Sequence, residues 1–147
     1  MQSGENYVGY ERTENFASNA TPDKPRPYSV PKHLALNQWA LSGDWTMGKE
    51  ALRLNQSGGR IVYHFHARDL HLVMGPAAQS AWARFRVYID GRPPAEAHGV
   101  DVDADGNGTV REPRMYQMVR QRAPISDRQF EIEFLDSGVE AFSFTFG

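Results

Sequence analysis

"QFEIEFLDSGVEAFSFTF", residues 129–146, alternates apolar and polar side chains on both sides of an Asp-Ser-Gly sequence. Alternation with a period of two is typical of a β-strand that buries one face. We therefore expect a hairpin across an Asp-Ser-Gly turn, in which two rows of apolar side chains face each other. The rows are Phe130, Ile132 and Phe134 on one strand, and Phe142, Phe144 and Phe146 on the other.

The same alternation recurs upstream. In "WARFRVYIDG" (82–91) the pattern separates Ala83, Phe85, Val87 and Ile89 from Trp82, Arg84, Arg86 and Tyr88. Ile61, Tyr63 and Phe65 share one face of a strand that follows Gly58 and Gly59. Two further segments, 34–41 and 44–55, flank a Ser-Gly pair that is typical of a turn.

Strands with one apolar face each predict an all-β fold, and no segment predicts a helix of three turns or more. Two sheets packed face to face would bury these apolar faces, so we expect an antiparallel two-sheet β-sandwich, a jelly roll. Its core should include Phe85, Val87, Phe130, Ile132, Phe142 and Phe144.

The domain organisation follows from the prolines. Residues 21–31, "TPDKPRPYSVP", contain four prolines in eleven residues, which favours an extended connector because proline lacks a donor N–H. We therefore expect residues 1–32 to form an N-terminal linker and residues 33–147 to form the sandwich.

Composition excludes several function classes. The 147 residues carry a formal charge of −2, and their 16 lysines and arginines are scattered, which argues against nucleic acid as a partner. No apolar run is long enough to span a membrane. Cysteine is absent, so thiol chemistry and cysteine-ligated zinc are excluded. No catalytic motif such as Gly-x-Ser-x-Gly is present, and nothing in the sequence predicts an enzyme.

The segment "DVDADGNGTVRE", residues 101–112, matches the side-chain pattern of an EF-hand calcium loop. Proline at 93, 94 and 113 excludes the helices that flank such loops. A bare loop can still wrap a calcium ion, which makes calcium a candidate cofactor. The alternative is a connection between strands in which Asp and Asn bond their own backbone. The candidate ligands are Asp101, Asp103, Asp105, Asn107 through its carbonyl, Thr109 and Glu112.

Two other groups are candidates for binding. Gly58, His64 and His66 resemble the start of a cupin metal motif, but the following carboxylate is missing and His71 is the nearest third ligand. The alternative is solvated surface histidines. The second group, Trp82, Arg84, Arg86 and Tyr88, predicts a platform on which a sugar ring stacks and arginines bond hydroxyls. The alternative for tryptophan is burial in the core.

Several blocks carry a resemblance to a known family over residues 7–147. They include "YVGYERTENFAS", "LNQWALSGDW", "GGRIVYHFHARDLHLVMG", "HGVDVDADGNGTV", "RMYQMVRQ" and "FEIEFLDSGVEAFSFTFG". The chain resembles the C-terminal domain of bacterial thioredoxin-like proteins, of the kind found in the cytochrome c biogenesis protein DipZ. The resemblance implies a sandwich similar to carbohydrate-binding modules, placed after a thioredoxin fold. It assigns no redox residue to this chain, which lacks the Cys-x-x-Cys of that fold.

The resemblance implies a non-catalytic accessory domain that binds carbohydrate or a redox partner protein. The alternative is a structural domain that packs on the thioredoxin fold of the same polypeptide and has no ligand of its own. The first predicts an exposed aromatic groove, and the second an apolar patch near the N-terminal segment. The sequence assigns no compartment; fusion to a membrane part would imply the extracytoplasmic, periplasmic side, and otherwise the cytoplasm.

Overall fold

A computed structural model describes residues 3–78 and 81–147, and in these residues the only helical element is the 3₁₀ turn η1 (Ala95–Ala97). None of the helical structure described there has the length and apolarity needed to cross a membrane. The strands are β1 (Asn6–Tyr7), β2 (Pro25–Tyr28), β3 (Trp39–Met47), β4 (Leu52–Leu54), β5 (Arg60–Phe65), β6 (Asp69–Pro76), β7 (Ala83–Ile89), β8 (Asn107–Val110), β9 (Arg114–Arg120), β10 (Arg128–Phe134) and β11 (Val139–Phe146).

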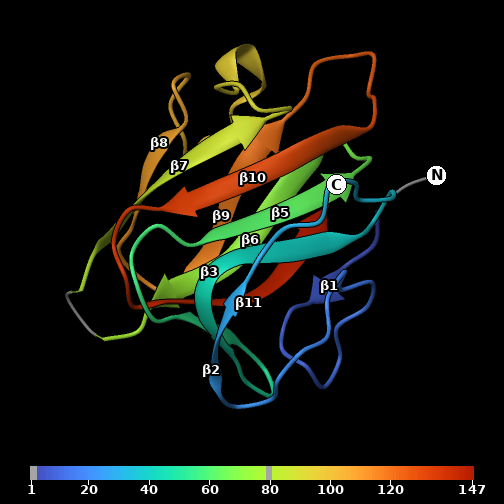
Figure 1. The fold of residues 1–147 in the computed structure, drawn as a ribbon. Helices are drawn as coiled ribbons and strands as arrows, with labels where there is room; N and C mark the ends of the chain where they lie inside the picture. Colours follow the sequence, from blue (N-terminus) through green and yellow to red (C-terminus); the bar gives the residue numbers. More distant parts are fainter. Residues whose placement is uncertain (1–2, 79–80) are drawn as a thin grey trace.

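The strands form two antiparallel layers that share β3. The first sheet has the order β8-β7-β10-β5-β3, and the second has the order β3-β4-β11-β6-β9, with β1 added to β11 and β2 to β3. Figure 1 shows β7, β10, β5 and β3 in front of β9, β6 and β11. The predicted two-sheet antiparallel sandwich is confirmed; its jelly-roll connectivity stays a prediction.

The expected Ser-Gly turn is instead a bend within β3. Residues 39–42 pair with β5 in the first sheet, while residues 43–47 pair with β2 and β4 in the second. Gly43 has a φ of +99°, a conformation that glycine adopts without a Cβ clash. The bend therefore carries one strand from one sheet to the other.

The hairpin predicted over residues 129–146 is wrong. β10 pairs with β5 and β7 in the first sheet, whereas β11 pairs with β6, β4 and β1 in the second. Their apolar rows meet across the core, where the rings of Phe130 and Phe144 pack edge to face with centroids 6.0 Å apart. The two rows do face each other, but as opposite walls of the sandwich.

The core contains five of the six residues predicted for it, because Phe85, Val87, Phe130, Ile132 and Phe144 are all buried. Phe142 is the exception and is only half-buried. The register of β11 shifts between Ala141 and Ser143, an irregularity that interrupts the alternation of faces. Phe142 consequently lines two surface pockets, one beside Arg53 of β4 and the other beside Tyr7 of β1.

The described part of the predicted linker, residues 3–32, packs on the sandwich. β1 and β2 pair with β11 and β3, and Val8 and Tyr28 are buried in the core. Asn6 donates a hydrogen bond to the Tyr63 hydroxyl at 3.0 Å. Proline is tolerated in β2 because an edge strand leaves its outer backbone groups unpaired. Proline content therefore indicated an extended backbone but not its pairing.

Candidate functional site

The outermost strands of the two sheets, β8 and β9, follow each other in the chain and are joined by residues 111–113. We call the surface around this connection the β8–β9 edge. The loop that precedes β8 lies against β9, because the Gly99 N–H donates to the Met118 carbonyl and the Asp101 N–H to the Gln117 carbonyl. Side chains from the loop, β8 and β9 are thereby brought together.

Asp103 holds the turn before β8. Its Oδ1 accepts hydrogen bonds from the N–H groups of Asp105, at 3.0 Å, and Asn107, at 2.8 Å. These bonds, the Asn107 one foremost, lower the pKa of the Asp103 carboxyl. Gly106 closes the turn with a φ of +94°, and a Cβ there would lie 2.2 Å from the Val87 carbonyl oxygen. Asp103 thus serves its own backbone.

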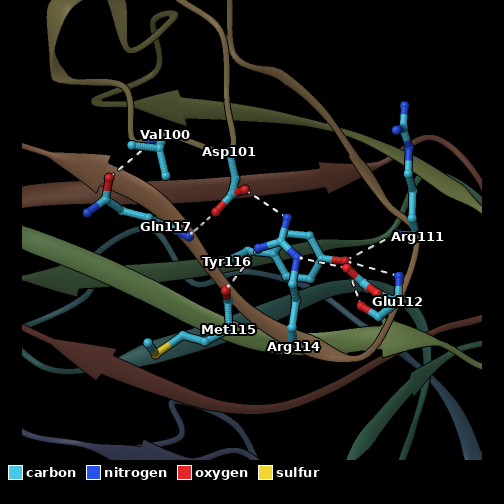
Figure 2. A network of polar contacts seen from close by, with 8 residues as sticks. All are labelled: Val100, Asp101, Arg111, Glu112, Arg114, Met115, Tyr116 and Gln117. Carbon is cyan, nitrogen blue, oxygen red and sulfur yellow. Dashed lines mark hydrogen bonds and ion pairs between the residues drawn. The ribbon is translucent and has the colours of Figure 1, made fainter.

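Asp101 joins the loop to β9 and is shown in Figure 2. One carboxylate oxygen accepts a bond from the Arg114 guanidinium at 2.8 Å, and the other from the Gln117 N–H at 2.7 Å. Partial burial raises the pKa of Asp101, but these hydrogen bonds outweigh that effect and the pKa is lowered. Both oxygens are therefore engaged inside the protein.

Arg114 lies over the ring of Tyr116, with its guanidinium carbon 3.8 Å from the ring centroid. Tyr116 is buried, and its hydroxyl donates to the Glu112 carbonyl at 2.6 Å. The same hydroxyl accepts from the N–H groups of Arg111 and Glu112 at 3.2 and 3.3 Å. One phenol therefore fixes the connection between β8 and β9.

A polar pocket of about 390 Å³ opens at the β8–β9 edge. Its lining combines two guanidinium groups, two carboxylates and two hydroxyls, which suits a ligand rich in hydrogen-bonding groups. The residues that supply these groups and the wall beneath them are Asp101, Thr109, Arg111, Glu112, Arg114 and Tyr116.

Trp82 lies beside this pocket: it is not part of the lining, but it contacts Arg111, which is. The Arg111 guanidinium carbon lies 4.6 Å from the centroid of the indole ring, and Trp82 is 59% exposed. Arg111 is exposed as well. Among the residues that the structure describes, no carboxylate lies within 4.0 Å of its guanidinium. The edge therefore presents an arginine on an aromatic ring with its N–H groups open to solvent.

The four residues predicted to form a sugar-binding platform do not all lie on one strand face. Arg84, Arg86 and Tyr88 share the outer face of β7, whereas Trp82 precedes the strand and packs with Arg111. Arg84 makes two 3.0 Å bonds to Asp136, Arg86 bonds Asn107 at 3.2 Å and Tyr88 bonds Glu133 at 3.4 Å. This face is a network of internal pairs, so sugar binding across all four residues stays a prediction.

The predicted calcium ligands do not converge. Asp101, Thr109 and Glu112 line the edge pocket together with two arginines, while Asp103 faces its own turn. The Asn107 carbonyl accepts the Asp103 N–H at 3.0 Å. Within residues 3–78 and 81–147, no three His, Cys, Asp or Glu side chains are grouped closely enough to hold a metal ion.

The histidines of the cupin-like pattern have separate partners. A ring nitrogen of His64 lies 2.9 Å from the Leu34 carbonyl, and one of His66 lies 2.6 Å from Asp127. His71 is on β6 in the other sheet. The structure thus does not bring the three imidazoles to one point.

A family model described as a thioredoxin-like C-terminal domain matches residues 3–147. The chain belongs to this family. The resemblance to the C-terminal domain of thioredoxin-like proteins, inferred from the sequence blocks, is thereby confirmed over residues 3–147. The likeness to DipZ in particular stays a prediction. A comparison with curated proteins finds no relative of similar sequence.

Solved structures show the fold of this domain in other proteins. An active-site mutant of a family two carbohydrate esterase from Clostridium thermocellum matches with 12% identity and a TM-score of 0.58, over 76% of this chain and 31% of the esterase. The family two esterase from Cellvibrio japonicus matches with 12% identity and a TM-score of 0.52, over 72% and 29%.

A carbohydrate-binding module from a marine laminarinase of Zobellia galactanivorans matches with 11% identity and a TM-score of 0.44, over 96% of this chain and 97% of the module. The domain spans less than a third of each esterase. At such identity the esterases share a β-sandwich with this domain, and neither site nor substrate follows from the likeness.

Proposed function

We propose that this domain is a non-catalytic accessory module that binds carbohydrate at the β8–β9 edge, in a polypeptide that also carries a thioredoxin fold. Membership of the thioredoxin-like C-terminal domain family supports the second part. The observation that carries the first part is an indole ring, 59% exposed, beside a polar pocket of about 390 Å³.

The chemistry of the edge matches what a sugar ring requires. The C–H face of a pyranose stacks on an aromatic ring, and a tryptophan gives the largest surface for this contact. The hydroxyls around the ring need donors and acceptors, which Arg111, Thr109 and Glu112 supply. The pocket volume lies within the range of about 300 to 1,000 Å³ that is typical of small-ligand sites.

Affinity electrophoresis of the 147-residue chain through gels containing single polysaccharides tests this function. The panel should contain neutral and acidic plant, algal and bacterial polymers. We expect retardation by at least one polymer, its loss in Trp82→Ala and its retention in Val100→Ala. Val100 is a suitable control because it is an exposed apolar side chain outside the pocket lining. Migration unaffected by every polymer, or equal retardation of both variants, would overturn the proposal.

A second function, packing on the neighbouring thioredoxin fold, is favoured by one observation. Phe142, turned away from the core by the irregularity in β11, lines a pocket of about 270 Å³ together with Tyr7 of the N-terminal segment. An apolar ring beside the segment that would connect to an upstream domain is what this alternative predicts.

The two functions are separable with a polypeptide containing both domains. If the sandwich packs on the thioredoxin fold through Phe142, Phe142→Ser should separate their thermal transitions and leave polysaccharide retardation unchanged. Thermal transitions that are identical in Phe142→Ser and the parent protein would exclude this packing role.

A further inference from the structure

The geometry of Arg111 limits the class of sugar that the edge can prefer. A guanidinium stacked on an aromatic ring keeps one face on the ring and points its five N–H groups outward in a plane. Arg111 has this arrangement on Trp82, at 4.6 Å. The stacking restricts the side chain before a ligand arrives, so less conformational freedom is lost when its N–H groups bind.

On the same edge, a second arginine is stacked on an aromatic ring and is also paired with a carboxylate. Arg114 lies 3.8 Å from the centroid of Tyr116, and its N–H groups meet the Asp101 carboxylate at 2.8 Å. A second carboxylate, that of Glu112, lies 3.6 Å from the Arg114 Nε. On this surface, therefore, a stacked guanidinium is matched by a carboxylate, as its planar, charged fork favours.

Arg111 has no such partner among the residues described. Of the neighbouring carboxylates, Asp101 is engaged through both oxygens, one with Arg114 and the other with the Gln117 N–H, and Glu112 lies 3.6 Å from the Arg114 Nε. Figure 2 shows the Arg111 side chain extending away from the Arg114 guanidinium and from Asp101. A ligand anion beside Arg111 would therefore approach from the side opposite to Asp101, where its repulsion from that carboxylate is weakest.

We infer that the β8–β9 edge binds an acidic saccharide, with the sugar ring against Trp82 and its carboxylate on the Arg111 guanidinium. This inference rests on the proposed carbohydrate-binding function and names its ligand class. Thr109 and Glu112 are left for the hydroxyls of the ring. The exposed indole favours a sugar over an acidic peptide, because an aspartate or glutamate side chain has no ring face to stack.

Matched polymers test the inference on the 147-residue chain. Polygalacturonate, alginate and glucuronoxylan oligosaccharides are compared by calorimetry with the same oligosaccharides after carboxyl reduction, which replaces each carboxylate by a neutral hydroxymethyl group and keeps the linkages. We expect at least one acidic form to bind tenfold or more tightly than its reduced form. Raising the salt concentration should weaken binding of the acidic form alone, because it screens the ion pair.

Variants of Arg111 test whether this residue causes the preference for acidic over carboxyl-reduced oligosaccharides. Arg111→Ala should lower the affinity for the acidic form to that for the reduced form, and Arg111→Lys should give an intermediate value because it keeps the charge without the planar fork. Arg12→Ala is the matched control: Arg12 is also stacked on an aromatic ring, Tyr7, at 3.9 Å, but lies away from the edge pocket. It should bind like the parent protein.

The outcomes separate the inference from the proposed function. Equal binding of acidic and reduced forms, with loss in Trp82→Ala, would overturn the acidic ligand class and leave carbohydrate binding intact. Binding of no oligosaccharide of either form, together with free migration in every polysaccharide gel, would overturn both. Equal losses in Arg12→Ala and Arg111→Ala would show diffuse charge attraction, and competition by polyglutamate at equal carboxylate concentration would show that the ligand need not be a sugar; each overturns the inference.

Discussion

Two arginines on the β8–β9 edge are each stacked on an aromatic ring, and they differ in the burial of that ring and in their charged partners. Arg114 covers the buried Tyr116 and is bound by Asp101, so its charge is matched inside the fold. Arg111 covers the exposed Trp82, and no described carboxylate pairs with it. An arginine stacked on an aromatic ring thus stabilises the edge at Arg114, whereas at Arg111 its N–H groups remain open to a ligand.

The two rings should differ most in their effect on stability. Tyr116→Ala should lower the free energy of unfolding by about 3 to 5 kcal/mol, because it removes a buried ring and the hydroxyl that fixes the β8–β9 connection. Trp82→Ala should cost less than about 1 kcal/mol, since the ring is 59% exposed. Urea denaturation followed by circular dichroism measures both. Equal losses would show that Trp82 is a structural residue.

The two guanidiniums should differ in their coupling to Asp101. We expect a double-mutant cycle to give about 1 kcal/mol between Asp101 and Arg114, a value reduced by the partial exposure of the arginine. The cycle between Asp101 and Arg111 should give less than about 0.3 kcal/mol, because no hydrogen bond or ion pair joins these two side chains. Similar coupling energies in the two cycles would contradict the separation of the pairs.

Acid should remove the internal pairs and leave Arg111 unaffected. Hydrogen bonds from the Arg84 side chain and N–H lower the pKa of Asp136 to about 2. A carboxyl with a lowered folded-state pKa contributes stability above its unfolded pKa of about 3.9, and this contribution is lost as pH falls toward 2. Melting temperatures between pH 5 and pH 2 should therefore fall less steeply in Asp136→Asn than in the parent protein. Arg111→Ala should follow the parent curve, and a flattened curve for it would reveal a carboxylate partner.

Period-two alternation predicted the faces of the strands but not their partners. Phe85, Val87, Phe130, Ile132 and Phe144 are buried as predicted, because a side chain's face depends on local backbone geometry. Pairing depends on the rest of the chain, and the Asp-Ser-Gly sequence that suggested a hairpin instead joins strands of opposite sheets. The irregularity that half-exposes Phe142 has no signal in the alternation itself.

The candidate site was predictable only in part for the same reason. Trp82 was identified because an alternating strand pattern placed it on the polar face. Arg111 and Arg114 were missed, since their importance comes from partners distant in sequence, Trp82 and Asp101. Tyr116 was missed as well, although its partners Arg111, Glu112 and Arg114 are close to it in sequence. The spacing of Arg114 and Tyr116, two residues apart on one strand, was the one local signal that a stacked pair was present.

Calcium should have the smallest effect on stability, and adding it tests the loop that contains Asp101, the partner of Arg114. To bind the ion, Asp101 would have to leave Arg114 and the Gln117 N–H, and Asp103 would have to leave the N–H groups of Asp105 and Asn107. Losing these bonds opposes the gain from coordination, so millimolar calcium should leave the melting temperature of the chelator-treated protein nearly unchanged. If calcium instead binds the folded state alone, a concentration of about a hundred times Kd would add roughly 2.7 kcal/mol. A rise in melting temperature that chelator reverses and Asp103→Ala abolishes would show that the loop rearranges around calcium, and that the internal pair of Asp101 and Arg114 is not its only stable arrangement.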